Sequence, residues 1–162
     1  MNIFKTIKLI NVKSFWQLVL LGFRNPFFIY PTINATKQCL SISTKYYGRL
    51  HYQNTPANAF RHAFWNYLIA KKCTKWSNKI NKVTNWTKLI TDWHENAFRN
   101  REIARQMDFH NNKVGRLVFI KHENDSIEKV IDIFIEMALN SIKITEQTTF
   151  QNHKFSLVHL SE

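Results

Sequence analysis

Three short segments of this sequence combine side chains that can do acid–base or metal chemistry. These segments cover residues 58–66, 91–95 and 107–116. Each contains a histidine, and the second and third also contain carboxylates. Imidazole changes its charge near neutral pH and is the commonest metal ligand in proteins. A site built from the three segments would therefore suit general acid–base or metal-assisted chemistry.

The first segment carries a polar stripe on a helix that the sequence predicts from Pro56 to about Lys72. Asn58, His62 and Asn66 are spaced by four, so their side chains share one face of that helix. The rest of the helix is largely apolar, so this face meets either solvent or a polar pocket. A single histidine on a helix is usually structural, but the two flanking amides favour a polar site.

The second segment, Thr-Asp-Trp-His-Glu, holds the first acidic residues of the chain, beginning with Asp92. His94 and Glu95 are adjacent, so on a helix their side chains diverge by about 100°. Both can reach one site only if that site lies at the edge between their faces. Position 98 is Phe, so the second histidine of an H-E-x-x-H zinc motif is missing and that class of site is excluded.

The third segment contains Asp108 and His110, two residues apart. In a turn such a pair projects the same way, whereas on a helix it diverges, and Asn111, Asn112 and Gly115 favour a turn. A carboxylate beside an imidazole suits a pair of metal ligands, or a general base with its orienting acid. On its own, the segment is better explained as an Asn-rich loop with an Asx turn.

Together the segments offer three imidazoles and several carboxylates, and helical bundles build sites from such inward-facing side chains. The catalytic residues expected from this set are His62, His94, Glu95, Asp108 and His110. The expected metal ligands, which suit Zn²⁺ or another divalent metal, are His62, His94, His110 and Asp108. The residues expected to bind an anionic substrate are Asn58, Asn66, Asn111, Asn112 and Arg116. Without a metal, a histidine would act as general base beside an orienting carboxylate.

Charge is distributed unevenly along the chain, whose net charge is +12. Residues 1–91 contain fourteen Lys or Arg and no Asp or Glu, whereas residues 92–162 contain nine basic and eleven acidic residues. A basic half of this kind favours contact with phosphates, either in nucleic acid or at an anionic membrane surface. A Lys- and Asn-rich composition without a specific partner explains the same pattern, because the basic residues form no block.

The N-terminal segment, residues 1–30, is apolar and basic. Its two apolar runs, 14–23 and 27–30, are too short to span a bilayer, which takes about 18–20 residues. No small-residue cleavage site typical of a signal peptide follows the first run. We therefore expect no transmembrane span and an amphipathic segment that lies on an anionic membrane surface or packs on the core.

The two cysteines, Cys39 and Cys73, match no metal-binding spacing. The sequence gives no sign of secretion, so we expect both thiols to be reduced. A disulfide between the two cysteines is the alternative. These features do not fix the compartment, but they favour the cytoplasm or the membrane periphery over secretion.

The length suits one domain over residues 1–162, and residues 55–118 hold its motif-bearing core. The predicted fold is an all-α bundle of five or six helices, with too few strand signals for a sheet. Residues 150–160 are expected to form an extended or disordered tail. The predicted helices cover approximately residues 12–23, 31–48, 56–72, 78–97, 100–106 and 126–138.

The three polar segments resemble an uncharacterised bacterial domain family whose pattern looks like AFRHAxWN, DxHE and MDLHNNxVGR, in that order. The match covers about residues 55–118 and departs mildly at Phe109, where Leu is usual. Such domains occur as standalone proteins in Bacteroidetes and at the C-termini of Rhs/YD-repeat or wall-associated polymorphic proteins, where toxins are often placed. By analogy, the resemblance implies a small hydrolase that uses the residues named above.

The leading hypothesis from the sequence is therefore a helical hydrolase, metal-assisted or not, that acts on a phosphate ester or an ester. A phospholipid is preferred as substrate because the N-terminal segment suits a membrane surface. The alternative is a non-enzymatic basic module that binds nucleic acid or anionic membrane, with the His/Asn/Asp cluster as a structural polar core. The hydrolase hypothesis requires His62, His94 and His110 to line one cavity.

Overall fold

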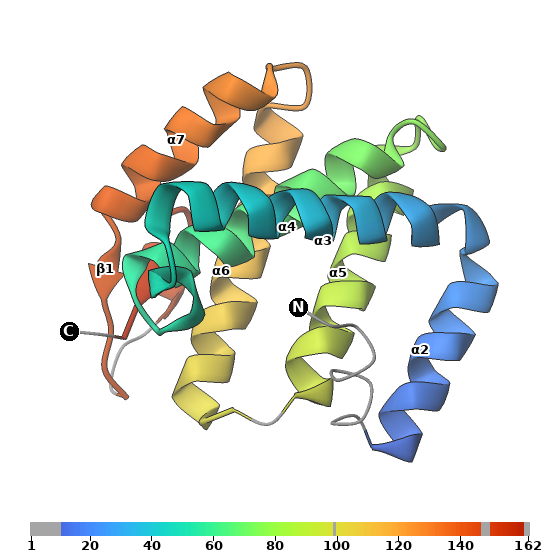
Figure 1. Cartoon of the computed structure of the whole chain (residues 1–162), viewed down its shortest axis with the longest axis horizontal. Coiled ribbons are helices and arrows are strands. Elements are labelled where there is room, and N and C mark those ends of the chain that lie inside the picture. The colour runs from blue at the N-terminus through green and yellow to red at the C-terminus, as the bar shows by residue number, and fades with distance from the viewer. Residues whose placement is uncertain (1–10, 99, 147–149, 161–162) are drawn as a thin grey trace.

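The computed structural model describes residues 11–98, 100–146 and 150–160, which form a single all-α domain as the sequence predicts. Helix α3 crosses in front of α5 and α6, and α2 stands at one edge of the domain (Figure 1). The α-helices of the described part are α2 (Val12–Arg24), α3 (Pro26–Tyr47), α4 (Pro56–Cys73), α5 (Ile80–Ala97), α6 (Glu102–Lys121) and α7 (Ile127–Leu139). The shorter elements are η1 (Leu50–Tyr52), β1 (Ile142–Lys143), η2 (Phe150–His153) and β2 (Val158–His159). No helix in the described ranges is long and apolar enough to cross a membrane.

Helix α4 is the centre of the fold and contacts α3, α5, α6 and α7. It begins at Pro56, as predicted, because the amide that proline lacks would have no helical partner at that position. Its aromatic side chains Phe60, Phe64 and Tyr67 are fully buried and contact the Phe134 ring of α7. Burying each large apolar side chain contributes about 1.5–3 kcal/mol, so this cluster makes α4 a rigid platform for its polar face.

Helix α6 passes α4 at very short range. A Cβ atom added to Gly115 would lie 2.1 Å from the backbone oxygen of Ala63, closer than any non-bonded contact allows. Only glycine permits this approach. Asp108 and Asn112 lie seven and three residues before Gly115, on the same side of α6, so the close crossing brings both side chains to α4.

The turn predicted within residues 107–116 is wrong, because these residues lie in the middle of α6. The fifth helix therefore does not end near Gln106. Asn111 and Asn112 are buried and hydrogen-bonded to other elements, and Gly115 serves the helix crossing. Tertiary contacts thus outweigh the local preference of these residues for turns.

Other helix boundaries differ from the prediction by a few residues. Helix α3 begins at Pro26, so Pro31 lies inside the helix rather than at its start. Helix α5 begins at Ile80, and α7 is capped by Ser126, whose side chain accepts a hydrogen bond from the Lys129 amide. Helix α2 agrees with its predicted range to within one residue.

The C-terminal segment forms a small parallel sheet that the sequence did not predict. Strand β1 pairs with β2, with Ile142 opposite Val158. Two-residue strands are too short to produce an alternating pattern, so no periodicity signals them. The side chain of Asn111 bonds both backbone groups of Val158 and thereby fixes β2 against α6. Cys39 and Cys73 are buried and free, which agrees with the predicted reduced thiols.

Candidate functional site

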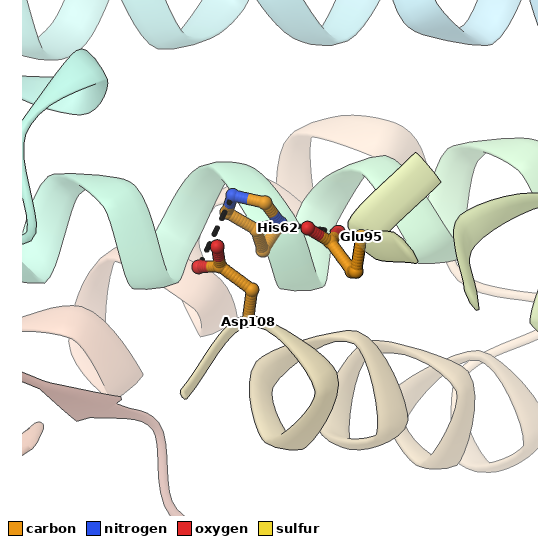
Figure 2. Close-up of side chains that lie close together, drawn as sticks. All are labelled: His62, Glu95 and Asp108. Carbon is orange, nitrogen blue, oxygen red and sulfur yellow. Dashed lines mark ion pairs between the residues drawn. The ribbon is translucent and has the colours of Figure 1, made fainter. Parts of the chain in front are cut away.

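One imidazole and two carboxylates from three helices meet inside the domain. His62 of α4 lies between Glu95 of α5 and Asp108 of α6, with both acids directed at its ring (Figure 2). The Nδ1 atom of His62 is 3.3 Å from Glu95 Oε1, and its Nε2 atom is 3.3 Å from Asp108 Oδ1. Within the described ranges, these three residues are the group of His, Cys, Asp or Glu with ligand atoms all within 4.8 Å of one another.

The cluster is almost inaccessible to solvent. His62, Glu95 and Asp108 are 3 %, 6 % and 5 % exposed. Buried charges are costly unless they are paired, hydrogen-bonded or bound to a metal. A buried group of two carboxylates and one imidazole therefore needs a specific source of stabilisation.

Two asparagines hold Glu95 in place through hydrogen bonds, one directly and the other through the first. The amide of Asn112 donates a hydrogen bond of 2.8 Å to Glu95 Oε1. Asn66 in turn donates 2.6 Å to Asn112 Oδ1 and 3.1 Å to the backbone oxygen of His62. This chain of amides fixes the Glu95 carboxylate relative to α4, which is the role of residues that orient metal ligands or catalytic groups.

Arg116 joins the same network at its far end. Its Nη1 atom donates 2.7 Å to Asn66 Oδ1, which also accepts from the Thr91 hydroxyl at 3.2 Å. Asn112, Asn66 and Arg116 therefore form a chain of hydrogen bonds that fixes the position of the Glu95 carboxylate. Substrate binding by the same side chains stays a prediction.

Arg61 is a member of the site that the sequence did not single out. Its Nη2 atom lies 2.7 Å from His62 Nε2, the nitrogen that also faces Asp108. The guanidinium group also lies over the ring of Tyr52, 5.8 Å from its centroid. The only sequence signal for this role is the Arg-His pair inside the first polar segment.

Three buried polar atoms in this region have no hydrogen-bond partner. They are Asn58 Oδ1, His62 Nδ1 and Asp108 Oδ1. Asn58 precedes His62 by one helical turn, on the predicted polar stripe. His62 Nδ1 and Asp108 Oδ1 each lie 3.3 Å from an ion-pair partner without forming a hydrogen bond, whereas the large majority of buried side-chain polar atoms in native proteins are hydrogen-bonded.

The surroundings of the two carboxyl groups push their pKa values apart. Burial raises the pKa of Asp108, and the nearby His62 offsets this only in part. Burial also acts to raise the pKa of Glu95, but the charge and hydrogen bonding of His62, with Asn112, hold it below its usual range. A pair with diverging pKa values is typical of acid–base sites, with Glu95 ionised and Asp108 the more easily protonated group.

His94 lies near the cluster but outside the ligand group, so its predicted role as a metal ligand is not supported by the geometry. Its ring packs against Trp65 and Phe98, with centroids 5.1 Å and 4.7 Å away. Burial lowers the pKa of His94 to about 4, so the ring is neutral near pH 7. As adjacent residues, His94 and Glu95 diverge around α5, and Figure 2 shows Glu95 directed at His62.

His110 points away from the other two histidines, so the predicted cavity lined by three imidazoles is wrong. Its Nε2 atom lies 2.9 Å from the backbone oxygen of Ser156, and its ring packs on Phe150. The physical reason is that residues 107–116 are helical, and residues two apart on a helix diverge. Asp108 therefore reaches His62, whereas His110 and Asn111 hold the C-terminal segment.

A comparison with protein-family models finds a match over residues 19–143 to "Domain of unknown function (DUF6973)". The chain belongs to this family. The DUF6973 match spans α4, α5 and α6 and so contains His62, Glu95 and Asp108. No curated protein and no solved structure matches the chain.

In this DUF6973 chain, a cavity of about 180 Å³ opens beside the cluster. Its lining residues are Thr36, Cys39, Leu40, Tyr52, Arg61, His62, Trp65 and His94. Leu40, Tyr52 and Trp65 give the wall an apolar part, and Arg61, His62 and His94 give it nitrogen-bearing ionisable groups. Burial raises the pKa of the Cys39 thiol to about 12, which excludes this cysteine as a thiolate nucleophile at neutral pH.

Proposed function

We propose that this protein is a small hydrolase whose site holds a divalent metal between His62, Glu95 and Asp108. The observation that carries the proposal is the buried convergence of one imidazole and two carboxylates from three helices. Two of their polar atoms, His62 Nδ1 and Asp108 Oδ1, lack hydrogen-bond partners. A cation bound among them would stabilise both carboxylates at once.

The spacing of the three side chains is compatible with a small metal ion. Ligand atoms around tetrahedral Zn²⁺ lie about 3.3 Å apart, since each bond is about 2.0–2.1 Å long. Each imidazole–carboxylate separation is 3.3 Å, but the two involve different ring nitrogens, so one of them at most joins two ligands of the same ion. One ligand atom from each of the three residues lies within 4.8 Å of the other two. One ring nitrogen of His62 would bind the ion, while the other faces a carboxylate, as in metal-bound histidines generally. Zn²⁺ is the first choice, and other divalent metals that accept nitrogen and oxygen ligands are the second.

Three protein ligands leave a coordination position for water, which distinguishes a catalytic from a structural site. A bound metal would supply hydroxide near neutral pH by lowering the pKa of that water. Arg61 is placed to bind the oxygens of an anionic substrate and to stabilise the negative charge that develops during hydrolysis. Asn66 and Asn112 hold Glu95 in position throughout.

The substrate we propose is a phosphate ester or a carboxylic ester with an apolar portion, and a phospholipid is preferred. The cavity beside His62 pairs an aromatic and aliphatic wall with one guanidinium group, which suits a molecule that is anionic at one end and apolar at the other. The resemblance of the three motifs to modules of polymorphic toxins favours a hydrolase over other enzyme classes.

A second candidate function has its own supporting observation. The hydrogen bonds from Asn112 to Glu95 and from Asn66 to Asn112 form a satisfied network of the kind found in structural polar cores. In that case His62 and the two acids would form a structural polar core without a metal, and the protein would be a non-enzymatic module that binds nucleic acid or anionic membrane.

Metal binding separates the two candidates. We expect purified protein to bind about one equivalent of Zn²⁺ or Mn²⁺ in calorimetry and to melt at a higher temperature with the metal. Asp108→Asn and Glu95→Gln should abolish both effects, whereas the matched variants outside the cluster, Asp125→Asn and Glu102→Gln, should not. The metal-loaded protein should hydrolyse bis(p-nitrophenyl) phosphate or a short-chain phospholipid, and His62→Gln should remove this activity.

The hydrolase proposal is wrong if the wild-type protein binds neither metal and hydrolyses neither substrate. An Asp108→Asn variant that is as stable as the wild type and equally active would also contradict it. Metal binding without hydrolysis of any ester would leave a metal-binding protein and refute the catalytic part.

A further inference from the structure

Helix α2 carries an exposed apolar stripe along its whole length. Val12, Trp16, Leu20 and Phe23 follow one another at spacings of four, four and three, so they share one face of the helix. Their exposed fractions are 74 %, 59 %, 55 % and 80 %. Figure 1 shows α2 at the edge of the domain.

The opposite face of α2 is packed on the rest of the protein. The Trp93 indole of α5 donates a hydrogen bond of 2.8 Å to the backbone oxygen of Ser14. Leu18 and Leu21 pack against the hydrophobic core. Helix α2 is therefore docked by one side, and the exposure of its other side does not result from detachment of the helix.

The beginning of α3 extends this surface. Phe27, Tyr30 and Ile33 are spaced by three and are exposed, Phe27 and Tyr30 by 69 % each. The Phe27 ring stacks on Trp76, which follows α4 and is itself exposed, with ring centroids 6.0 Å apart. Monomeric proteins rarely expose so many large apolar side chains on adjoining elements, and those that do usually use them for binding.

The charged residues on α2, on α3 and directly before Trp76 are all basic. Lys13 and Arg24 are exposed on α2, and Lys75 is exposed beside Trp76. No Asp or Glu occurs anywhere before Asp92, so the sequence adds no acidic residue to either helix. Trp and Tyr favour the level of the lipid headgroups, and basic residues are attracted to anionic lipids.

We infer that α2 and the first turns of α3 form a docking surface for an anionic phospholipid bilayer. Trp16, Phe23 and Tyr30 would enter the headgroup region, and Lys13 and Arg24 would contact lipid phosphates. A second copy of the chain fits this surface less well, because a symmetric contact would place two basic faces against each other. The inference concerns a surface separate from the His62 cluster and does not depend on the proposed function.

Vesicle sedimentation with the full-length protein tests the inference. We expect binding to vesicles of phosphatidylcholine and phosphatidylglycerol (3:1), weak binding to phosphatidylcholine alone, and release of the protein from the mixed vesicles in 0.5 M NaCl. Tryptophan fluorescence should shift to shorter wavelength when the protein binds. The double variant Trp16→Gln with Phe23→Gln should lose at least tenfold in partitioning.

A matched control uses the equally exposed apolar residues Leu139 and Phe155. The double variant Leu139→Gln with Phe155→Gln should bind vesicles as the wild type does. The charge variant Lys13→Gln with Arg24→Gln leaves the apolar stripe intact. It should reduce binding to the vesicles that contain phosphatidylglycerol and leave the weak binding to phosphatidylcholine vesicles unchanged. This variant keeps the test informative if the α2 apolar variant does not fold.

Several results would overturn the inference. They are failure of the wild type to bind anionic vesicles, equal binding by the wild type and by both α2 variants, and equal binding to vesicles with and without phosphatidylglycerol. Dimerisation in solution that the Trp16→Gln and Phe23→Gln changes abolish, without vesicle binding, would assign the surface to a second copy of the chain instead.

Discussion

Gly115 of α6 lies directly against the backbone of Ala63 in α4. A Cβ atom on Gly115 would lie 2.1 Å from the Ala63 oxygen and 2.8 Å from its Cα. Ala63 is the neighbour of His62, and Asp108 is two helical turns before Gly115 on the same face of α6. This crossing therefore sets the distance between the imidazole and the Asp108 carboxylate.

Substitution of Gly115 by alanine is expected to destabilise the fold strongly. The clash involves backbone atoms of a buried helix, which cannot move away as a side chain can. We expect Gly115→Ala to lower the free energy of unfolding by more than about 3 kcal/mol, the upper end of ordinary overpacking. Urea denaturation followed by circular dichroism measures the change.

The matched control is Gly22→Ala in α2. A Cβ atom at Gly22 would meet only the tip of the Ile29 side chain, at 3.3 Å, which can rotate away. Since alanine favours a helix by about 1 kcal/mol over glycine, this variant should be as stable as the wild type or more stable. Equal stability of the Gly115→Ala and Gly22→Ala variants would show that the helices do not approach so closely.

The Asn112 amide links Glu95 to Asn66 and is expected to control metal affinity without touching the metal. Asn112→Ala removes the hydrogen bond of 2.8 Å to Glu95 Oε1, which frees the carboxylate to rotate. Loss of such an orienting group typically weakens metal binding by about 10–100-fold. Calorimetric titration with Zn²⁺ measures the effect.

Asn96→Ala serves as the control for the Asn112 variant. Asn96 also links α5 to α6, because its side-chain oxygen accepts a hydrogen bond from Arg105. Unlike Asn112, it is exposed, and its side chain forms no hydrogen bond with His62, Glu95 or Asp108. Its substitution should leave Zn²⁺ affinity unchanged. If Asn112→Ala binds Zn²⁺ as tightly as Asn96→Ala does, the amide does not orient a metal ligand.

Part of the site could be predicted from the sequence because it depends on spacing within one helix. Thr55 and Pro56 mark the start of α4, and the i, i+4 spacing places Asn58, His62 and Asn66 on one face. The structure shows that this face is buried rather than exposed to solvent. The charge asymmetry likewise requires no coordinates.

The rest could not be predicted, because it depends on which segments are helical and how they cross. The turn preferences of Asn111, Asn112 and Gly115 are strong, yet all three residues lie within α6. The two asparagine side chains bond other elements, and Gly115 allows the close approach to α4 because it has no Cβ atom. Once 107–116 is helical, Asp108 and His110 must face different neighbours. The role of Arg61 depends on the orientation of one guanidinium group, which the Arg-His pair in the sequence does not determine.

His110 is expected to contribute to stability and not to the metal site. His110→Ala removes the contacts with the Ser156 backbone oxygen and the Phe150 ring, so it should destabilise the protein by about 1–3 kcal/mol. Its Zn²⁺ affinity should stay within twofold of the wild type, whereas His62→Ala should lose binding. Calorimetry on both variants, with limited proteolysis of the C-terminal segment, distinguishes these effects. Loss of Zn²⁺ binding in a folded His110→Ala protein would contradict this prediction and support the hypothesis that three histidines form the site.

His51 is expected to make stability depend on pH. It is fully buried, and its Nε2 atom lies 3.0 Å from the Thr44 hydroxyl. Burial, with a smaller effect from the charge of Arg61, lowers the pKa of His51 below its ordinary value of 6.5. The unfolded chain therefore takes up this proton more readily than the folded protein does.

The sign of the effect follows from that difference in pKa. The stability contributed by neutral His51 is fully present above pH 6.5 and is lost progressively as the pH falls toward the lower pKa of the folded state. His51→Gln cannot take up a proton, so the difference in unfolding free energy between wild type and variant should shift in favour of the variant from pH 7.5 to pH 5. Urea denaturation of both proteins across this range measures the shift, and the other titrating groups cancel in the comparison. A difference that stays constant with pH would mean that His51 has the same pKa in the folded and unfolded chains.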